Sequence, residues 1–189
     1  MRILKATLLG ALLCSFFMAN AQDAGVAKSI FNAQTGPIGV WVSNEARLAN
    51  TFALRTEIGL DLWIYGSDYD RSGAVLAPSI KVEPRWYYNI EKRAAKGKYT
   101  ANNSANVITI AVKYTPDLLI GGHPDYVNLP NELSITPKWI MRRTIAKSNF
   151  NYELGGGIGY VTYLSESDIR MNDGADVLVD IHARIGYTF

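Results

Sequence analysis

FALRTEIGLDLWIY, residues 52–65, alternates apolar and polar side chains along its whole length. Successive side chains of a β-strand point to opposite faces, whereas at helical spacing the charges would scatter around the axis and Gly59 would weaken the helix. The stretch therefore predicts a strand with one apolar and one polar face. The apolar face carries Phe52, Leu54, Thr56, Ile58, Leu60, Leu62 and Ile64, and the polar face carries Ala53, Arg55, Glu57, Gly59, Asp61, Trp63 and Tyr65.

The same alternation recurs on both sides of this stretch. It predicts strands at residues 36–48, 76–88, 106–114, 133–142, 150–160 and 177–189. Tight turns are expected at 49–50 and 147–149, and longer polar connections at 65–73, 115–130 and 165–175. The basic segment 90–105 stands where a short turn is expected, and we interpret it as a solvated loop. With no linker between the strands, the pattern predicts one β-rich domain.

Strict alternation fits a membrane barrel, apolar outside and polar inside, and also a lipocalin-like barrel with the opposite polarity. Three features favour the membrane barrel. The strands exceed the roughly five to six residues of an average strand, and the closing strand ends the given sequence on Tyr187 and Phe189. Aromatic residues of the apolar face also gather beside the short turns, as in an interfacial girdle. They are Phe52, Trp86, Tyr88, Phe150, Tyr152, Tyr187 and Phe189.

The strand number follows from a parity argument. Bacterial single-chain barrels have an even number of strands. We therefore expect an eighth strand at residues 26–33, followed by a turn at Gln34-Thr35-Gly36-Pro37. The predicted fold is all-β, an antiparallel up-and-down transmembrane β-barrel of eight strands.

The first 21 residues have the form of a secretory signal peptide. Arg2 and Lys5 precede an apolar run, and Ala19-Asn20-Ala21 forms a cleavage signal that would leave Gln22 first. The run is shorter than the about 20 residues of a transmembrane helix, and Leu13 before Cys14 is not the small residue of a lipoprotein site. We expect residues 1–21 to be a signal peptide and residues 22–189 the barrel domain. The overall charge of +2 comes from Arg2 and Lys5, so it does not indicate nucleic-acid binding.

The chain resembles the small outer-membrane β-barrel proteins of Gram-negative bacteria. The resemblance lies in the signal peptide, the alternating strands and the closing strand DIHARIGYTF, and the stretches GVWVSNEARL, ALRTEIGLD and VEPRWYYNI resemble uncharacterised barrels of the Bacteroidetes. It implies an outer-membrane location, contact with outer-membrane lipid and lipopolysaccharide, and insertion by the barrel-assembly machinery, which reads the terminal Phe189 with Tyr187 and Ile185.

The polar faces predict a charged interior. An eight-stranded barrel is just wide enough for side chains to fill it, and buried charges persist when they are paired. We expect a salt-bridged plug, with a polar channel or binding cavity as the alternative. Gly155, Gly157 and Gly159 could leave room or let Trp63 or Tyr87 pack against them. The expected inward charges are Arg55, Lys81, Arg85, Lys138, Arg142 and Arg184 against Glu57, Asp61, Glu83, Glu153 and Asp180.

Catalytic and metal motifs are weak. A lipid A deacylase would need a Ser beside a His, but His182 is followed by Ala183 and Arg184, and His123 lies in a Gly-Gly-His-Pro-Asp loop. We expect His182 to make an interior hydrogen bond and His123 to be a solvated turn residue. GGGIG at Gly155 lies within a strand, unlike a phosphate loop, and we expect no cofactor. Four outer-loop acids could bind Ca²⁺ weakly, but a solvated role is expected for Asp68, Asp70, Asp168 and Asp173.

We therefore expect a non-enzymatic outer-membrane barrel with a structural or surface-interaction role. No catalytic, cofactor-binding or metal-binding residue is predicted. An enzyme acting on lipid A and a small-solute channel remain the alternatives.

Overall fold

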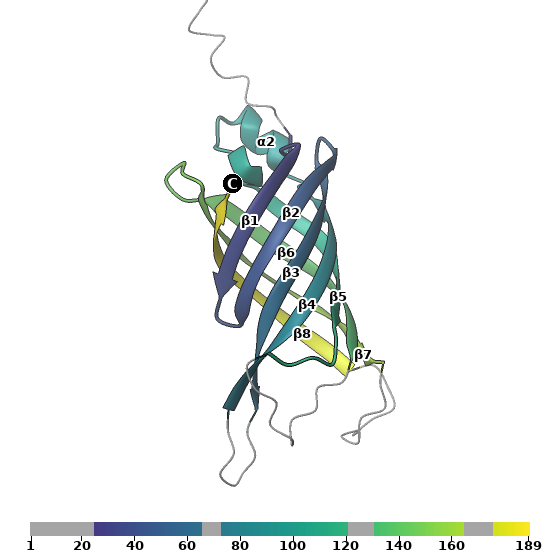
Figure 1. Cartoon of the computed structure of the whole chain (residues 1–189). Coiled ribbons are helices and arrows are strands. Elements are labelled where there is room, and N and C mark those ends of the chain that lie inside the picture. Colours follow the sequence, from purple (N-terminus) through teal and green to yellow (C-terminus); the bar gives the residue numbers. More distant parts are fainter. Residues whose placement is uncertain (1–24, 66–72, 121–130, 165–175) are drawn as a thin grey trace, which may run out of the picture.

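The computed structural model describes residues 25–65, 73–120, 131–164 and 176–189. Eight antiparallel strands form a closed barrel in chain order, which confirms the predicted fold (Figure 1). None of the described helices is long and apolar enough to span a membrane. The strands are β1 (Ser29–Gly36), β2 (Gly39–Ala49), β3 (Phe52–Tyr65), β4 (Gly73–Trp86), β5 (Asn106–Thr115), β6 (Glu132–Thr144), β7 (Phe150–Tyr163) and β8 (Asp176–Thr188).

The barrel closes where β1 meets β8. Their paired residues run from Asn32 with Thr188 to Thr35 with Ile185, and the Phe189 amide donates to the Phe31 carbonyl at 2.9 Å. The first strand and its turn were predicted about three residues too early. Gln34 and Thr35 belong to β1, where they pair with Trp41 and Val40, and β2 begins at Gly39 rather than residue 36.

The physical reason for this shift lies in the turn itself. Gly36 pairs with Gly39, so the turn between them consists only of Pro37 and Ile38. Pro37 has no amide hydrogen to donate to a ladder. Gly39 has φ +152°, a conformation that side chains rarely adopt, so glycine allows the second strand to begin there.

The strand faces have the polarity of a membrane barrel. On β3, Arg55 and Glu57 are 1% and 3% exposed, whereas Ile58 and Ile64 on the opposite face are 68% and 79% exposed. Lys81, Glu83 and Arg85 on β4 are buried in the same way, and Ile80, Val82 and Trp86 are exposed. A lipocalin-like barrel would bury the apolar face, so its polarity is the reverse of the one observed.

The aromatic side chains predicted to gather beside the short turns contact one another on the outer surface. Phe52 stacks on Trp86 with ring centroids 6.0 Å apart, and Trp86 meets Tyr88 edge to face at 6.1 Å. On the other side of the barrel, Tyr187 lies 5.1 Å from both Phe150 and Phe189. These rings form two exposed clusters at the same end of the barrel.

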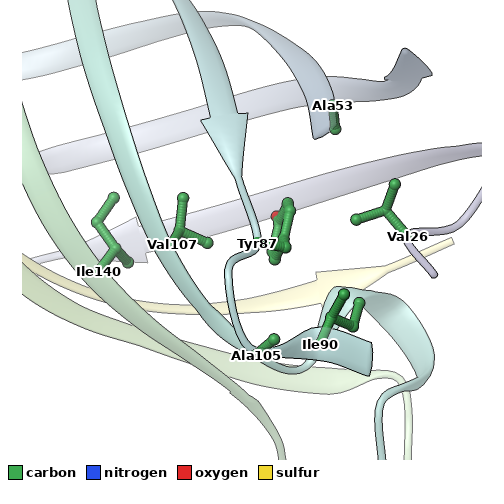
Figure 2. Close-up of a cluster of buried hydrophobic side chains, with 7 residues drawn as sticks. All are labelled: Val26, Ala53, Tyr87, Ile90, Ala105, Val107 and Ile140. Atoms are coloured by element: carbon green, nitrogen blue, oxygen red, sulfur yellow. The ribbon is translucent and has the colours of Figure 1, made fainter. Parts of the chain in front are cut away.

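The segment between β4 and β5 is a cap over the barrel end rather than a solvated loop, so that interpretation was wrong. It forms a short helix, α2 (Ile90–Ala95), and a 3₁₀ turn, η2 (Ala101–Asn103), at the end that holds the C-terminus (Figure 1). Ile90 and Ala105 are fully buried. They pack against apolar side chains that line this end of the barrel, as Figure 2 shows. The cluster comprises Val26, Ala53, Tyr87, Ile90, Ala105, Val107 and Ile140.

The basic composition of this segment concealed the cap. Its lysines lie on the exposed side, while Arg93 donates from Nε to the Ser104 carbonyl at 2.9 Å and holds the segment together. Asn102 and Asn103 have φ of 54° and 58°, a left-handed conformation that asparagine tolerates better than most residues. The segment therefore turns back on itself and places Asn103 inside the barrel.

Candidate functional site

The barrel interior has three levels along its axis. The apolar cap cluster lies at the end that holds the C-terminus and the β2–β3 and β6–β7 turns. A network of charged side chains fills the middle of the barrel, and a cavity of ≈ 500 Å³ lies beyond it, toward the opposite end. The charged side chains come from seven strands, because each strand turns its polar face inward.

Glu153 on β7 is the centre of the charge network. Its carboxylate is fully buried and accepts hydrogen bonds from three arginines and one histidine. Arg142 Nη1 lies 2.9 Å from Oε1, Arg55 Nη1 at 3.1 Å and Arg85 Nη1 at 3.2 Å from the same oxygen. His182 Nε2 lies 2.8 Å from Oε2. One carboxylate thus joins β3, β4, β6 and β8 to β7 across the lumen.

Two further carboxylates extend the network toward the cavity. Glu57 lies 2.7 Å from each of Arg55 Nη2, Arg184 Nη1 and Lys81 Nζ. Glu83 accepts from Arg85 Nη2 at 2.8 Å, and Lys138 Nζ lies 3.2 Å from its other oxygen. Buried charges are stable only when paired. Among the described residues seven cations meet seven carboxylates, and Lys113 and Asp180, with 26% and 28% of their side chains exposed, lie at the edge of the network. The paired residues are Arg55, Lys81, Arg85, Lys113, Lys138, Arg142 and Arg184 with Glu45, Glu57, Asp61, Glu83, Glu132, Glu153 and Asp180.

Glu45 connects the charge network to the cap. Its Oε2 lies 3.4 Å from Arg85 Nη1. Its Oε1 accepts from the Tyr87 hydroxyl at 2.5 Å and from the side-chain amide Nδ2 of Asn103. Asn103 Oδ1 in turn accepts from the Ala27 amide at 2.7 Å. Burial raises the pKa of the Tyr87 hydroxyl, and the nearby Glu45 carboxylate raises it further, so this hydroxyl remains a donor. The cap is therefore fixed by polar bonds as well as by apolar packing.

Trp41 lies where the charge network meets the cavity. Its indole Nε1 donates to Asp61 Oδ1 at 2.8 Å, and the Arg184 guanidinium carbon lies 3.6 Å from the ring centroid, a cation–π contact. Gly59, its register partner on β3, makes room for the ring, because a Cβ there would lie 2.0 Å from Trp41 Cδ1. Asp61 also pairs with Lys113 Nζ at 3.2 Å.

The middle of the lumen is closed to solvent. Arg85 and Glu153 are 0% exposed, and Arg55 and Arg142 are 1% exposed, although each reaches into the lumen from a different strand. A water-sized sphere therefore cannot pass between these side chains. The arrangement stabilises the barrel cross-section electrostatically, and as it stands it does not form a pore.

All of the charges that were predicted to face inward take part in this network. Alternation along the strands was enough to identify these residues. Sequence reasoning missed Glu45, Lys113 and Glu132. Glu132 lies one residue before the predicted strand 133–142. Trp41, Ser43 and Glu45 alternate with Val40, Val42 and Asn44, and Thr109, Ala111 and Lys113 alternate with isoleucine and valine. The same period-two signal could have found Glu45 and Lys113.

His182 faces the interior and makes the buried hydrogen bond that was predicted, to Glu153. The GGGIG segment lies within β7 as expected. Neither Trp63 nor Tyr87 fills the space beside Gly157. The Lys138 side chain packs there instead, since a Cβ at Gly157 would lie 2.6 Å from Lys138 Cγ.

Other predicted positions lie outside the described residues. They are the signal peptide at 1–21 with Cys14, the loop residue His123, and the acids Asp68, Asp70, Asp168 and Asp173. Within the described ranges, no group of three or more His, Cys, Asp or Glu side chains is placed to hold a metal ion. No protein-family model, curated protein or solved structure matches this chain.

Proposed function

We propose that this chain is an integral outer-membrane β-barrel of Gram-negative bacteria with a structural or surface-interaction role. Residues 1–21 direct export and are removed, and the mature barrel crosses the membrane with its charge network closing the lumen. The barrel is not an enzyme in this proposal, and it binds no cofactor. Its loops at the end opposite the cap face the cell exterior and contact lipopolysaccharide.

The observation that carries the proposal is the polarity of the wall. All eight strands turn large apolar side chains outward, while the charged side chains of the network, which are the most costly to remove from water, lie inside. In water this arrangement would expose apolar surface on every side, far beyond the patch size that soluble monomers tolerate. In a bilayer the same surface is solvated by hydrocarbon, and the closed ladder satisfies the backbone hydrogen bonds.

The aromatic clusters support an orientation in the membrane. Aromatic rings are favoured at the boundary between hydrocarbon and head groups. Phe52, Trp86, Phe150, Tyr187 and Phe189 would lie at the periplasmic boundary, beside the cap. The closing strand with Tyr187 and Phe189 would serve as the signal for the barrel-assembly machinery, as in the proteins that the sequence resembles.

Fractionation and electrical recording test this proposal. Expressed with its leader in a Gram-negative host, the chain should remain in the outer-membrane fraction after washing with carbonate and should begin at Gln22. Refolded into a planar bilayer, it should give no steady conductance. Recovery in soluble periplasm would contradict the location. Discrete current steps would favour the channel alternative, and altered lipid A in the mass spectrum of expressing cells would favour the enzyme.

A further inference from the structure

The barrel wall is incomplete on one side within the described residues. β8 pairs with β7 from Asp176 to Tyr187, but it pairs with β1 only from Ile185 to Thr188. β1 ends at Gly36, and Figure 1 shows the β1–β2 turn stopping well short of the ends of β3 and β4. The described residues therefore leave the β8 edge from Asp176 to His182 without a strand beside it, a length of roughly 20 Å at about 3.3 Å per residue.

The interior cavity opens at this gap. Residues on both of its sides line the cavity: Ile38 in the β1–β2 turn, Leu62 on β3, and Val179 and Ile181 on β8. Val179 and Ile181 belong to the outward face and are 66% and 75% exposed. Outward side chains can border an interior cavity only at a free edge. The cavity is thus continuous with the outer surface of the barrel.

The cavity wall is mainly apolar. Trp41, Trp63 and Ala111 lie inside, and Ile38 and Ile181 form the rim. The charged side chains at the floor are already engaged. Lys81 and Arg184 pair with Glu57, and Lys113 pairs with Asp61. A volume of ≈ 500 Å³ lies in the usual range for ligand sites, which are apolar with a few polar groups.

An apolar groove also lies on the outer surface, across β1. It has a volume of ≈ 830 Å³ and shares Trp41 with the cavity. The small side chains of Ala33 and Thr35 on β1 form its floor, because the apolar side chains around them are larger and stand higher. Those neighbours are Val40, Val42, Ile58, Leu60, Ile185 and Tyr187.

The β8 edge from Asp176 to His182, which no described strand covers, adds polar backbone groups to the gap. Backbone amide and carbonyl groups at this edge need hydrogen-bond partners, since leaving them unsatisfied in hydrocarbon is costly. A lipid supplies both parts of the match, because its ester and phosphate oxygens can accept from the amide groups of the strand edge while its chain fills the apolar space. A purely polar solute would leave the tryptophan-lined cavity unfilled.

We propose that one hydrocarbon chain of an outer-membrane lipid enters the barrel through the gap between β8 and the β1–β2 turn and occupies the cavity. The proposal rests on the membrane location proposed above. The lipid head group stays at the β8 edge, and the chain ends above the layer formed by Trp41 and Arg184. The barrel is then a lipid-binding protein that is closed along its axis and open toward the membrane.

Photolabelling tests this proposal. The mature barrel is refolded into phosphatidylcholine vesicles that contain a phospholipid with a diazirine at the end of one acyl chain. Labelled residues are located by mass spectrometry of peptides after irradiation. Outward Ile110 and Ile135 should be labelled by the surrounding lipid, and inward Ala111 and Ser134, on the far wall of the cavity, should be labelled as well. Ala111→Phe fills the cavity and should abolish labelling at Ser134 while Ile135 stays labelled.

Each outcome decides a different point. Labelling of Ile110 and Ile135 without Ala111 or Ser134 would overturn the lipid site and leave the membrane location intact. Failure to label Ile110 and Ile135 would contradict the membrane location itself. A free fatty acid with the same diazirine serves as a second probe. Inward labelling by this fatty acid alone would identify a free amphiphile as the occupant and overturn the assignment to membrane lipid.

Discussion

Arg55 on β3 and Glu153 on β7 form a buried ion pair across the lumen, with Nη1 3.1 Å from Oε1, although 98 residues separate them in the chain. Both side chains lie in the middle level of the interior, and neither is exposed to solvent by more than 1%. The contact joins opposite walls of the barrel and therefore depends on barrel diameter as well as on strand order.

Glu153→Gln should destabilise the barrel strongly. The substitution removes the negative charge that Arg55, Arg85 and Arg142 share. Their mutual repulsion is then offset only by Glu57 beside Arg55 and by Glu83 and Glu45 beside Arg85. We expect a loss of about 3–5 kcal/mol in the free energy of unfolding, measured by urea titration of the refolded protein in vesicles. Glu91→Gln on the exposed side of α2 is the control and should change stability by less than about 0.5 kcal/mol. Equal stability of both variants would contradict the role of the network.

Gly59→Ala should displace the Trp41 ring, which lies where the charge network meets the cavity. The added methyl group would lie 2.0 Å from Trp41 Cδ1, so the indole must move and lose its 2.8 Å bond to Asp61. The expected cost is about 1–3 kcal/mol, read from the same urea titration. The double variant Gly59→Ala with Trp41→Phe has a smaller ring and should recover part of this loss. A double variant less stable than the sum of the two single substitutions would rule out the steric explanation.

Ile80→Arg places a charge on the outer face of β4, where Ile80 is 55% exposed. In a bilayer this should cost about 2–4 kcal/mol if the position is near mid-membrane, because the guanidinium must enter hydrocarbon. Stability in vesicles is the measurement, and Ile80→Leu is the matched apolar control. A neutral effect of arginine would mean that this face meets water.

Lys147→Gly should stabilise the β6–β7 turn. The Ser148 amide donates to the Ile145 carbonyl at 2.9 Å, and Ala146 and Lys147 between them have φ of 48° and 56°. Two-residue turns of this kind favour glycine, because other L-residues strain in the left-handed region. We expect a gain of about 1 kcal/mol in unfolding free energy. Lys147→Ala tests the loss of the charge alone and should bring no such gain.

The sequence predicted the strand faces well because alternation with period two is a local property. Each inward charge on β3 and β4 could be assigned from its immediate neighbours. Alternation could not predict which charged side chains pair with one another across the lumen. Arg55 has Glu83 as its register partner, yet it bonds to Glu153, and this choice depends on how the closed barrel tilts and staggers its strands.

The sequence did not predict the cap or the gap beside β8, for two different reasons. The segment 90–105 looks solvated by composition, but Ile90, Asn103 and Ala105 anchor it through contacts with residues far away in the chain. The gap that the described residues leave between β8 and the β1–β2 turn arises from unequal strand lengths, because β1 ends at Gly36 while β8 continues beyond it. Placing the first turn three residues too early hid the exact position of that mismatch.

Spin labelling can determine whether the outer surface of the barrel meets lipid. Cys14 is the chain's single cysteine and belongs to the segment 1–21 that we propose is removed. Single cysteines can therefore be placed at outward Ile58, Ile80 and Ile110 of the barrel, with Glu91 on α2 as the water-exposed control. After refolding into vesicles, power saturation compares collisions of each label with oxygen, which concentrates in hydrocarbon, and with a polar nickel chelate. We expect labels at the three isoleucines to meet oxygen and exclude nickel, while the label at Glu91 meets nickel. Free access of nickel to all three isoleucine positions would show that this face meets water rather than lipid.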